Sequence, residues 1–238
     1  MAETLTTIGF DADDTLWHNE RFFALTQDRL VELLADHTDR ETLMARLLEA
    51  ERRNLPHYGF GIKGFVLSMI ETAIEVTDGT VPARVIADLL AAGRAMLAHP
   101  VELLPHAADT LSALQGHYRL IVITKGDLLD QERKLAASGL HGMFDAVEIV
   151  SDKSAATYAR IFDTHGDGAE RGLMVGNSMR SDVVPMIVAG GWGVHVPHGL
   201  QWALEHADAP DAPRFAELPH LGDLPGLLSR IRSGDPIR

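Results

Sequence analysis

The stretch Thr7-Ile8-Gly9-Phe10-Asp11-Ala12-Asp13-Asp14-Thr15-Leu16 decides how this chain folds. A short apolar run leads straight into acidic and hydroxyl residues, as at the carboxyl end of a buried parallel strand, where open α/β sheets bind ligands. Asp11 and Asp13 point the same way in an extended segment and repel each other unless a cation or a proton intervenes. The pattern predicts a metal site with one nucleophilic carboxylate and one acid–base carboxylate, and a polar turn capping the strand is the alternative.

Four further short runs have the same apolar, β-branched character. They lie at Leu120–Thr124, Val147–Val150, Leu173–Gly176 and Gly193–Val196. Helical patterns or turns rich in Gly and Asp follow them, which is typical of buried parallel strands joined by crossover helices. We therefore predict an α/β fold whose core is a Rossmann-like, doubly wound parallel sheet.

The segment between the first and second strands has a different pattern. From about Arg21 to His99 apolar residues recur at helical spacing, and no convincing strand occurs. We expect about four helices here, forming an all-helical cap inserted into the α/β chain. The predicted organisation is a catalytic core of residues 1–17 and 104–238, with the cap at residues 18–103.

Polar residues also follow the later strands. Thr124-Lys125-Gly126 ends the second strand just before a helix, whose free N–H groups would form an anion site. Lys153 follows the third strand, and Asn177 and Asp182 follow the fourth. Because parallel strands end at one edge of the sheet, these side chains are expected to gather around Asp11.

The ordered set of strand ends resembles the haloacid dehalogenase-like (HAD) hydrolase superfamily over nearly the whole chain. Asp11-x-Asp13-x-Thr15 resembles its first motif, Thr124 its second and Lys153 its third. Gly176-Asn177-x-x-x-x-Asp182 resembles its fourth, and the inserted helices resemble a C1-type cap. The resemblance implies a Mg²⁺-dependent phosphatase that hydrolyses a small phosphomonoester through an aspartyl-phosphate.

The resemblance also implies roles for individual residues. Asp11 would attack phosphorus, and Asp13 would protonate the leaving oxygen and then activate water. Thr124 and Lys153 would hold the phosphoryl oxygens, helped on the substrate side by Thr15, Lys125 and Gly126. Mg²⁺ would be bound by Asp11, the carbonyl of Asp13 and a side chain of the fourth motif, in agreement with its preference for a few oxygen ligands plus substrate.

The fourth motif departs from the family pattern at one position. Asn177 stands where the family usually has a metal-binding Asp. An amide oxygen still ligates Mg²⁺ but carries no charge, so either Asn177 is a weaker ligand or Asp182 takes over. This leaves open a non-catalytic phosphate or metabolite sensor with a weakened metal site.

Other activities of the same superfamily are weaker alternatives. The metal-free dehalogenase branch lacks the second aspartate of the first motif, whereas Asp13 is present. A phosphonatase would need a cap lysine as Schiff base, for which Lys63 is the only candidate. Signalling receivers also use Asp, Thr and Lys at strand ends, but the helical insert argues against that class.

Cationic residues of the cap are candidates for substrate binding. Arg52, Arg53 and Lys63 cluster around the stretch 54–64, whose glycines and proline favour a loop. We predict that they bind the non-reacting part of an anionic substrate, so that their removal raises KM. The G-x-G-x-x-G at residues 59–64 follows no strand and is interpreted as part of this cap loop.

Composition and the N-terminal sequence limit the partners and the location that we expect for this protein. The 238 residues contain no cysteine and carry a formal charge of −13, which disfavours nucleic-acid partners. Met1-Ala2-Glu3 shows no signal-peptide pattern and no apolar stretch spans a bilayer, so we expect a cytoplasmic protein without membrane contact. His195 and His198 flank Pro197 and are interpreted as a loop pair rather than a zinc site. Nothing indicates the oligomeric state.

Overall fold

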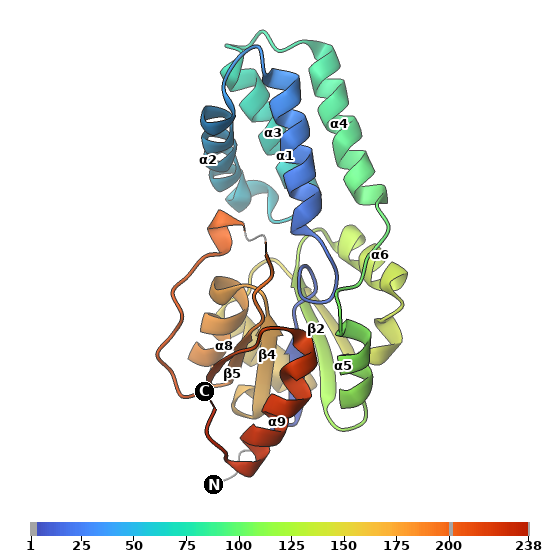
Figure 1. Cartoon of the computed structure of the whole chain (residues 1–238), viewed down its shortest axis with the longest axis vertical. Coiled ribbons are helices and arrows are strands. Elements are labelled where there is room, and N and C mark those ends of the chain that lie inside the picture. The colour runs from blue at the N-terminus through green and yellow to red at the C-terminus, as the bar shows by residue number, and fades with distance from the viewer. Residues whose placement is uncertain (1–3, 200–201, 238) are drawn as a thin grey trace. The chain divides into compact units, whose positions relative to one another are not determined.

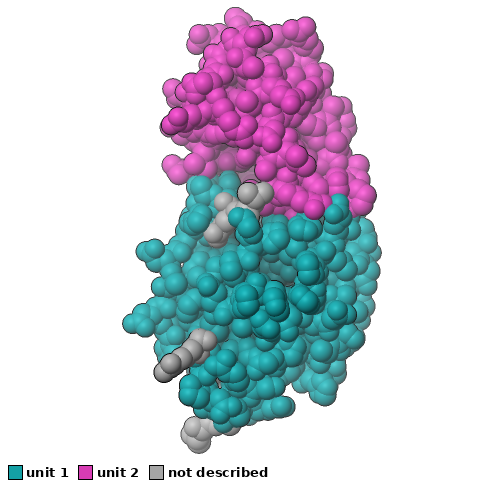
Figure 2. Space-filling view, in the orientation of Figure 1, with its two compact units in different colours: residues 1–18, 101–125, 131–238 teal, residues 19–100, 126–130 magenta. Residues whose placement is uncertain are grey.

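The structure is a computed structural model that describes residues 4–199 and 202–237. The chain divides into two compact units, coloured separately in Figure 2. The first contains residues 1–18, 101–125 and 131–238, and the second contains residues 19–100 and 126–130. No helix among the described residues is long and apolar enough to cross a membrane.

A parallel sheet forms the centre of the first unit (Figure 1), which confirms the predicted α/β fold. Its strands are β1 (Thr7–Phe10), β2 (Arg119–Lys125), β3 (Ala146–Val150), β4 (Gly172–Gly176), β5 (Trp192–His195) and β6 (Phe215–Glu217). The strand order is β3-β2-β1-β4-β5-β6. The sequence did not predict β6, an edge strand of three residues that is too short to show a strand pattern.

Helices cover both faces of this sheet, as in a doubly wound fold. The helices are α5 (Ala107–Leu114), α6 (Leu128–Ser138), α7 (Ala155–His165), α8 (Val184–Val188) and α9 (Leu224–Ser233). Side chains of α5, α6 and α9 pack with Phe10, Val122 and Val175. Side chains of α7 and α8 pack with Ile123 and Met174, whose positions alternate with those of the first set along the strands.

The register brings the carboxyl ends of β1 and β4 side by side, and β2 continues three residues further. Phe10 at the end of β1 pairs with Val122 of β2 and with Val175 of β4. The chain runs from β1 to β2 and β3 on one side, then crosses to β4 on the other side of β1. This is the topological switch point at which open α/β sheets bind ligands, so the residues that follow β1 and β4 lie where a site is expected.

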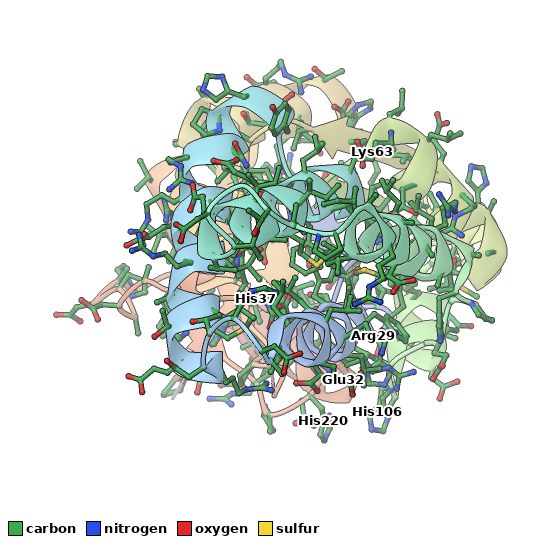
Figure 3. All side chains as sticks on the ribbon, turned by 90° about the horizontal axis from the view of Figure 1, so that it is seen from above. Arg29, Glu32, His37, Lys63, His106 and His220 are labelled. Carbon is green, nitrogen blue, oxygen red and sulfur yellow. The ribbon has the colours of Figure 1, made fainter. Side chains whose placement is uncertain are left out.

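The second unit contains four helices, as predicted. They are α1 (Glu20–Leu34), α2 (Arg40–Tyr58), α3 (Ile62–Val76) and α4 (Ala83–Ala98). Their buried core includes Leu30, Leu47, Met69 and Leu89. The helix faces that point away from this core carry charged side chains. On α1, for example, Arg29 pairs with Glu32 at 2.8 Å (Figure 3).

The prediction that residues 54–64 form a cap loop is mostly wrong. Helix α2 continues through Pro56 to Tyr58, and α3 begins at Ile62. Pro56 lies near the carboxyl end of α2, where its missing N–H removes one hydrogen bond of the final turn and little else. Arg52 and Arg53 are therefore helical, and the loop shrinks to residues 59–61, where Gly59 and Gly61 have positive φ values of 71° and 120°.

Candidate active site

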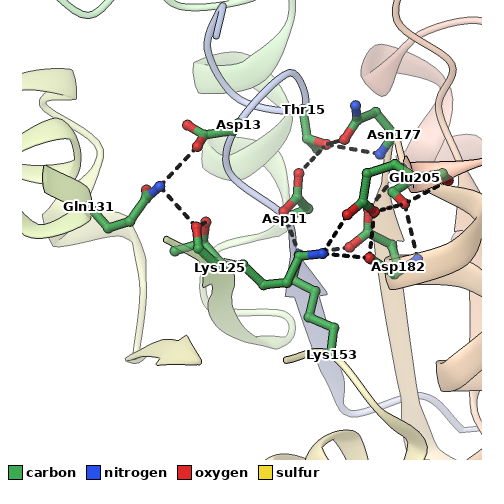
Figure 4. Close-up of polar contacts among 12 residues, drawn as sticks. Asp11, Asp13, Thr15, Lys125, Gln131, Lys153, Asn177, Asp182 and Glu205 are labelled. Atoms are coloured by element: carbon green, nitrogen blue, oxygen red, sulfur yellow. Dashed lines mark hydrogen bonds and ion pairs between the residues drawn. The ribbon is translucent and has the colours of Figure 1, made fainter. Parts of the chain in front are cut away.

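Most of the residues predicted to gather around Asp11, namely those of the first, third and fourth motifs, lie around it in the first unit (Figure 4), whereas Gly126 belongs to the second unit. Asp11 follows β1 directly, and its N–H donates to the Val175 carbonyl of β4 at 2.9 Å. The Thr15 hydroxyl donates to Asp11 Oδ2 at 3.0 Å and accepts the Asn177 backbone N–H at 3.1 Å. Thr15 thus joins the turn after β1 to the turn after β4 and orients the predicted nucleophile.

Lys153 connects Asp11 with Asp182. Its Nζ donates to Asp11 Oδ1 and, at 2.7 Å, to Asp182 Oδ1, and all three side chains are buried. Burial and the neighbouring Asp182 carboxylate raise the pKa of Asp11 to about 7, against the opposing effect of Lys153. Burial disfavours the ammonium form of Lys153, but Asp11 and Asp182 outweigh it and raise the pKa of Lys153. Lys153 is therefore a permanent cation beside Asp11.

The turn after β4 is shaped around Asp182. Residues Met179–Val183 form a single π-helical turn, a geometry that is frequent at functional sites. Asp182 Oδ2 accepts the Ser178 N–H at 2.9 Å, and a Cβ at Gly176 would lie 2.1 Å from the same oxygen. Only glycine at 176 lets this carboxylate approach the strand end. Both Asp182 oxygens are thus engaged with protein groups, which makes Asp182 an anchor for Lys153.

Asn177 lies against two groups that the resemblance assigns to Mg²⁺. One end of its amide lies 3.2 Å from both Asp11 Oδ2 and the Asp13 carbonyl, and hydrogen bonding assigns the nitrogen to that end when no ion is bound. Half a turn of the amide would present its oxygen instead. A carboxylate, a backbone carbonyl and an amide oxygen are hard oxygen donors, so these three groups fit Mg²⁺.

Asp13 is held by three side chains that the sequence analysis did not select for the site. Lys134 Nζ lies 2.7 and 2.8 Å from its two carboxylate oxygens. Trp17 Nε1 donates to Oδ1 at 2.7 Å, and Gln131 Nε2 donates to Oδ2 at 2.9 Å. The predicted acid–base group is therefore fixed in one orientation beside Asp11.

Lys125 is engaged with a carboxylate from a distant loop. Its Nζ lies 2.6 Å from Glu205 Oε1 and 2.7 Å from Ser181 Oγ, and the hydroxyls of Ser178 and Ser181 also donate to Glu205. Burial alone would raise the pKa of Glu205, but Lys125 and the two serines hold it below its usual value. The predicted substrate ligand Lys125 is thus part of a partly buried ionic cluster.

The other predicted site residues have the following positions. Thr124 is buried at the end of β2, and its hydroxyl donates to the Lys125 carbonyl at 3.3 Å. Gly126 has φ of 135°, a conformation that favours glycine. In the second unit Arg53 donates to Glu71 and Glu75, and Lys63 pairs with Asp127 at 3.3 Å, while Arg52 is exposed. Lys63 is 59% exposed, so it lacks the burial that activates a Schiff-base lysine.

Four residues contact the site but were not predicted from the sequence, because the local sequence around each gives little indication of such a role. Gln131 and Lys134 are three apart and share one face of α6, and Lys134 is one of only four lysines. Trp17 is 1% exposed and packs in the core, but the N–H of a buried tryptophan also needs an acceptor. Glu205 lies in a loop without any motif, 80 residues from Lys125, so no local pattern predicts it.

Comparison with known proteins agrees with this geometry. Residues 5–190 match the family of haloacid dehalogenase-like hydrolases, and the chain belongs to that family. A haloacid dehalogenase-like family hydrolase from Xanthomonas campestris is 39% identical with a TM-score of 0.87, over 98% of this chain and 94% of that chain. No curated protein matches the sequence.

Two more distant structures share the fold. The proposed HAD-hydrolase YfnB from Bacillus subtilis, solved bound to magnesium, is 19% identical with a TM-score of 0.68, over 95% of this chain and 99% of that chain. A 2-haloacid dehalogenase from Pseudomonas syringae is 20% identical with a TM-score of 0.61, over 95% and 99% of the two chains. The chain is therefore a HAD-like hydrolase, and the fold alone does not decide which bond it hydrolyses.

Proposed function

We propose that this protein is a Mg²⁺-dependent phosphatase that hydrolyses a small phosphomonoester through an aspartyl-phosphate on Asp11. The observation that carries the proposal is the second carboxylate, Asp13, held by Lys134, Gln131 and Trp17 two residues after the nucleophile. Phosphoryl transfer to Asp11 needs an acid for the leaving oxygen and a base for water. Halide displacement needs no acid for its leaving group.

The residues would act in two steps. In the first, an Asp11 oxygen bonds to phosphorus while the ester P–O bond breaks, and the leaving oxygen takes a proton from Asp13. In the second, water gives a proton to Asp13 and attacks phosphorus, which releases phosphate and restores the Asp11 carboxylate. Lys153 neutralises charge beside Asp11, and the Thr124 hydroxyl is a donor for a phosphoryl oxygen.

Three groups would hold the magnesium ion: the Asp11 carboxylate, the Asp13 carbonyl and the Asn177 amide oxygen. When bound, Mg²⁺ supplies positive charge for the phosphoryl oxygens. The pKa of about 7 for Asp11 supports the need for a cation, since without one the nucleophile is partly protonated at neutral pH. The engagement of both Asp182 oxygens favours Asn177 as the side-chain ligand after β4.

Turnover of an aryl phosphate with and without Mg²⁺, beside halide release from 2-chloropropionate, tests the proposal. Phosphate release that requires Mg²⁺, with no halide release, is the expected result. Metal-independent halide release would instead assign the dehalogenase reaction. If calorimetry detects binding of inorganic phosphate but no substrate turns over, the protein is a sensor and not an enzyme.

A further inference from the structure

A second group of possible metal ligands lies in the first unit. Asp14, His18 and His198 each bring one ligand atom into a cluster in which all three atoms lie within 4.8 Å of one another. His198 Nε2 is 3.8 Å from Asp14 Oδ1, and the rings of His18 and His198 are 5.3 Å apart between centroids. None of these three residues belongs to the phosphoryl-transfer site described above.

The backbone holds the cluster in place. Asp14 is 5% exposed and has φ of 60°, and its N–H donates to the Trp17 carbonyl at 2.8 Å. The His18 N–H donates to the Glu102 carbonyl at 3.0 Å. His198 follows β5, and its side chain is 31% exposed, so an ion can reach the cluster from solvent. Two segments far apart in the sequence thus meet at one partly buried point.

The neighbouring histidine of the sequence pair has another role. His195 Nδ1 contacts Glu217 at 2.8 Å, and its Nε2 contacts the Asn177 carbonyl at 3.1 Å. The interpretation that His195 and His198 do not form a zinc site together is therefore consistent with the structure. His198 is instead placed beside a histidine that lies 180 positions earlier in the chain.

We propose that Asp14, His18 and His198 bind a divalent transition-metal ion of the Zn²⁺ type, separate from the Mg²⁺ site. Two imidazole nitrogens and one carboxylate oxygen suit Zn²⁺ and its neighbours, whereas Mg²⁺ prefers oxygen ligands alone. Tetrahedral ligands about 2.1 Å from zinc are about 3.4 Å apart. The three ligand atoms, which lie within 4.8 Å of one another, would approach this spacing by rotation of the side chains. The fourth position of the tetrahedron is then left to water.

Calorimetric titration of Zn²⁺ into the full chain, kept saturated with Mg²⁺, tests this site. Wild type is expected to bind one Zn²⁺, and His18→Ala and His198→Ala are each expected to weaken binding at least tenfold. His117→Ala, at an exposed position of the same unit, is the matched control and should bind as wild type does. Thermal unfolding without Zn²⁺ checks that each variant is folded.

A second titration separates the two metal sites. Asp11→Asn disables the phosphoryl-transfer site but should leave Zn²⁺ affinity within about twofold of wild type, because Asp11 is not among the three ligands. The proposal is overturned if wild type binds no Zn²⁺, if only one of the two histidines matters, or if Asp11→Asn abolishes binding. Co²⁺ in place of Zn²⁺ gives an independent readout, since its visible absorption should change when either histidine is removed.

Discussion

Lys134 on α6 lies 2.7 and 2.8 Å from the two oxygens of the Asp13 carboxylate, 121 positions earlier in the chain. Both side chains are largely buried, at 10% and 22% exposure. Two charge-assisted hydrogen bonds to one carboxylate fix its rotation as well as its position. The orientation of Asp13, the proposed acid–base group, therefore depends on a helix that contributes no residue to the sequence motifs.

Lys134→Met is expected to lower kcat for an aryl phosphate by about 10- to 100-fold, a part of the 10²–10⁴-fold that acid–base catalysis contributes. KM should change less, because Lys134 is expected to act through Asp13 and not to touch the substrate. Steady-state kinetics measure both constants. Lys134→Arg, which keeps the cation, should recover part of the rate.

A double variant distinguishes positioning from a loss of fold. In the Asp13→Asn background Lys134→Met should add little, since the group that it positions is already inactive. Independent losses that multiply in the double variant would mean that Lys134 acts elsewhere. The acid–base limb of the pH–rate profile should move in Lys134→Met, which a purely structural role would not cause.

Asp11→Asn should remove turnover while the chain stays folded. The two side chains are nearly isosteric, and Lys153 keeps its bond to Asp182, so the site retains its shape. An amide is not a nucleophile and forms no acyl phosphate. Mass spectrometry after mixing with substrate should find a phosphorylated aspartate in the acid-quenched wild type and none in the variant. Residual turnover above about one part in a thousand would overturn the aspartyl-phosphate mechanism.

Stability should depend on pH through Asp11. Its pKa is raised from 3.8 to about 7. Between pH 3.8 and pH 7 the folded chain therefore keeps a proton on Asp11 that the unfolded chain has released. The stabilising contribution of this group is fully present below pH 4 and is lost as pH rises through 7. Each unit of that range is worth at most about 1.4 kcal/mol.

In metal-free buffer the Tm of Asp11→Asn should therefore rise relative to that of wild type as the pH increases from 5 to 8. Thermal unfolding of both proteins over that range measures the difference. Adding Mg²⁺ should raise the Tm of wild type at pH 8 more than that of the variant, since the ion favours the ionised carboxylate. A Tm difference that is constant with pH would show that Asp11 has an ordinary pKa.

The apolar strand patterns, and the polar residues that follow them, predicted the sheet and the site better than the helical patterns predicted the helix ends. The site around Asp11 was predictable because parallel strands end at one edge, which turns spacing along the chain into proximity. The contact between Lys134 and Asp13 depends on how α6 packs, and the loop bearing Glu205 has no pattern of its own. The extension of α2 through Pro56 was missed because packing of the helix outweighed the local signal of proline and glycine.

Arg53 is expected to act on the stability of the second unit rather than on substrate. Its guanidinium bridges Glu71 and Glu75 on α3 at 2.7 and 2.6 Å. Arg53→Ala should leave KM unchanged and lower Tm by no more than about 2 °C, because exposed ion pairs contribute little. Arg52→Ala is the matched comparison on the same helix, and a rise in KM for that variant alone would place the substrate contact at Arg52. A rise in KM for Arg53→Ala would restore the original interpretation.

Asn177→Asp should reverse the balance between the metal-free and metal-bound forms. With its nitrogen turned toward Asp11 Oδ2 and the Asp13 carbonyl, each 3.2 Å away, the Asn177 amide satisfies both oxygens when no ion lies between them. An aspartate at 177 would place a third oxygen against these two and add a negative charge. We expect a lower Tm than wild type in metal-free buffer, and Mg²⁺ binding that is about tenfold tighter in calorimetry. Asn177→Ala is the control, since it removes the amide without adding charge and should weaken the binding of Mg²⁺. Equal Mg²⁺ affinity in all three proteins would mean that residue 177 does not ligate the ion, and the assignment would then pass to Asp182.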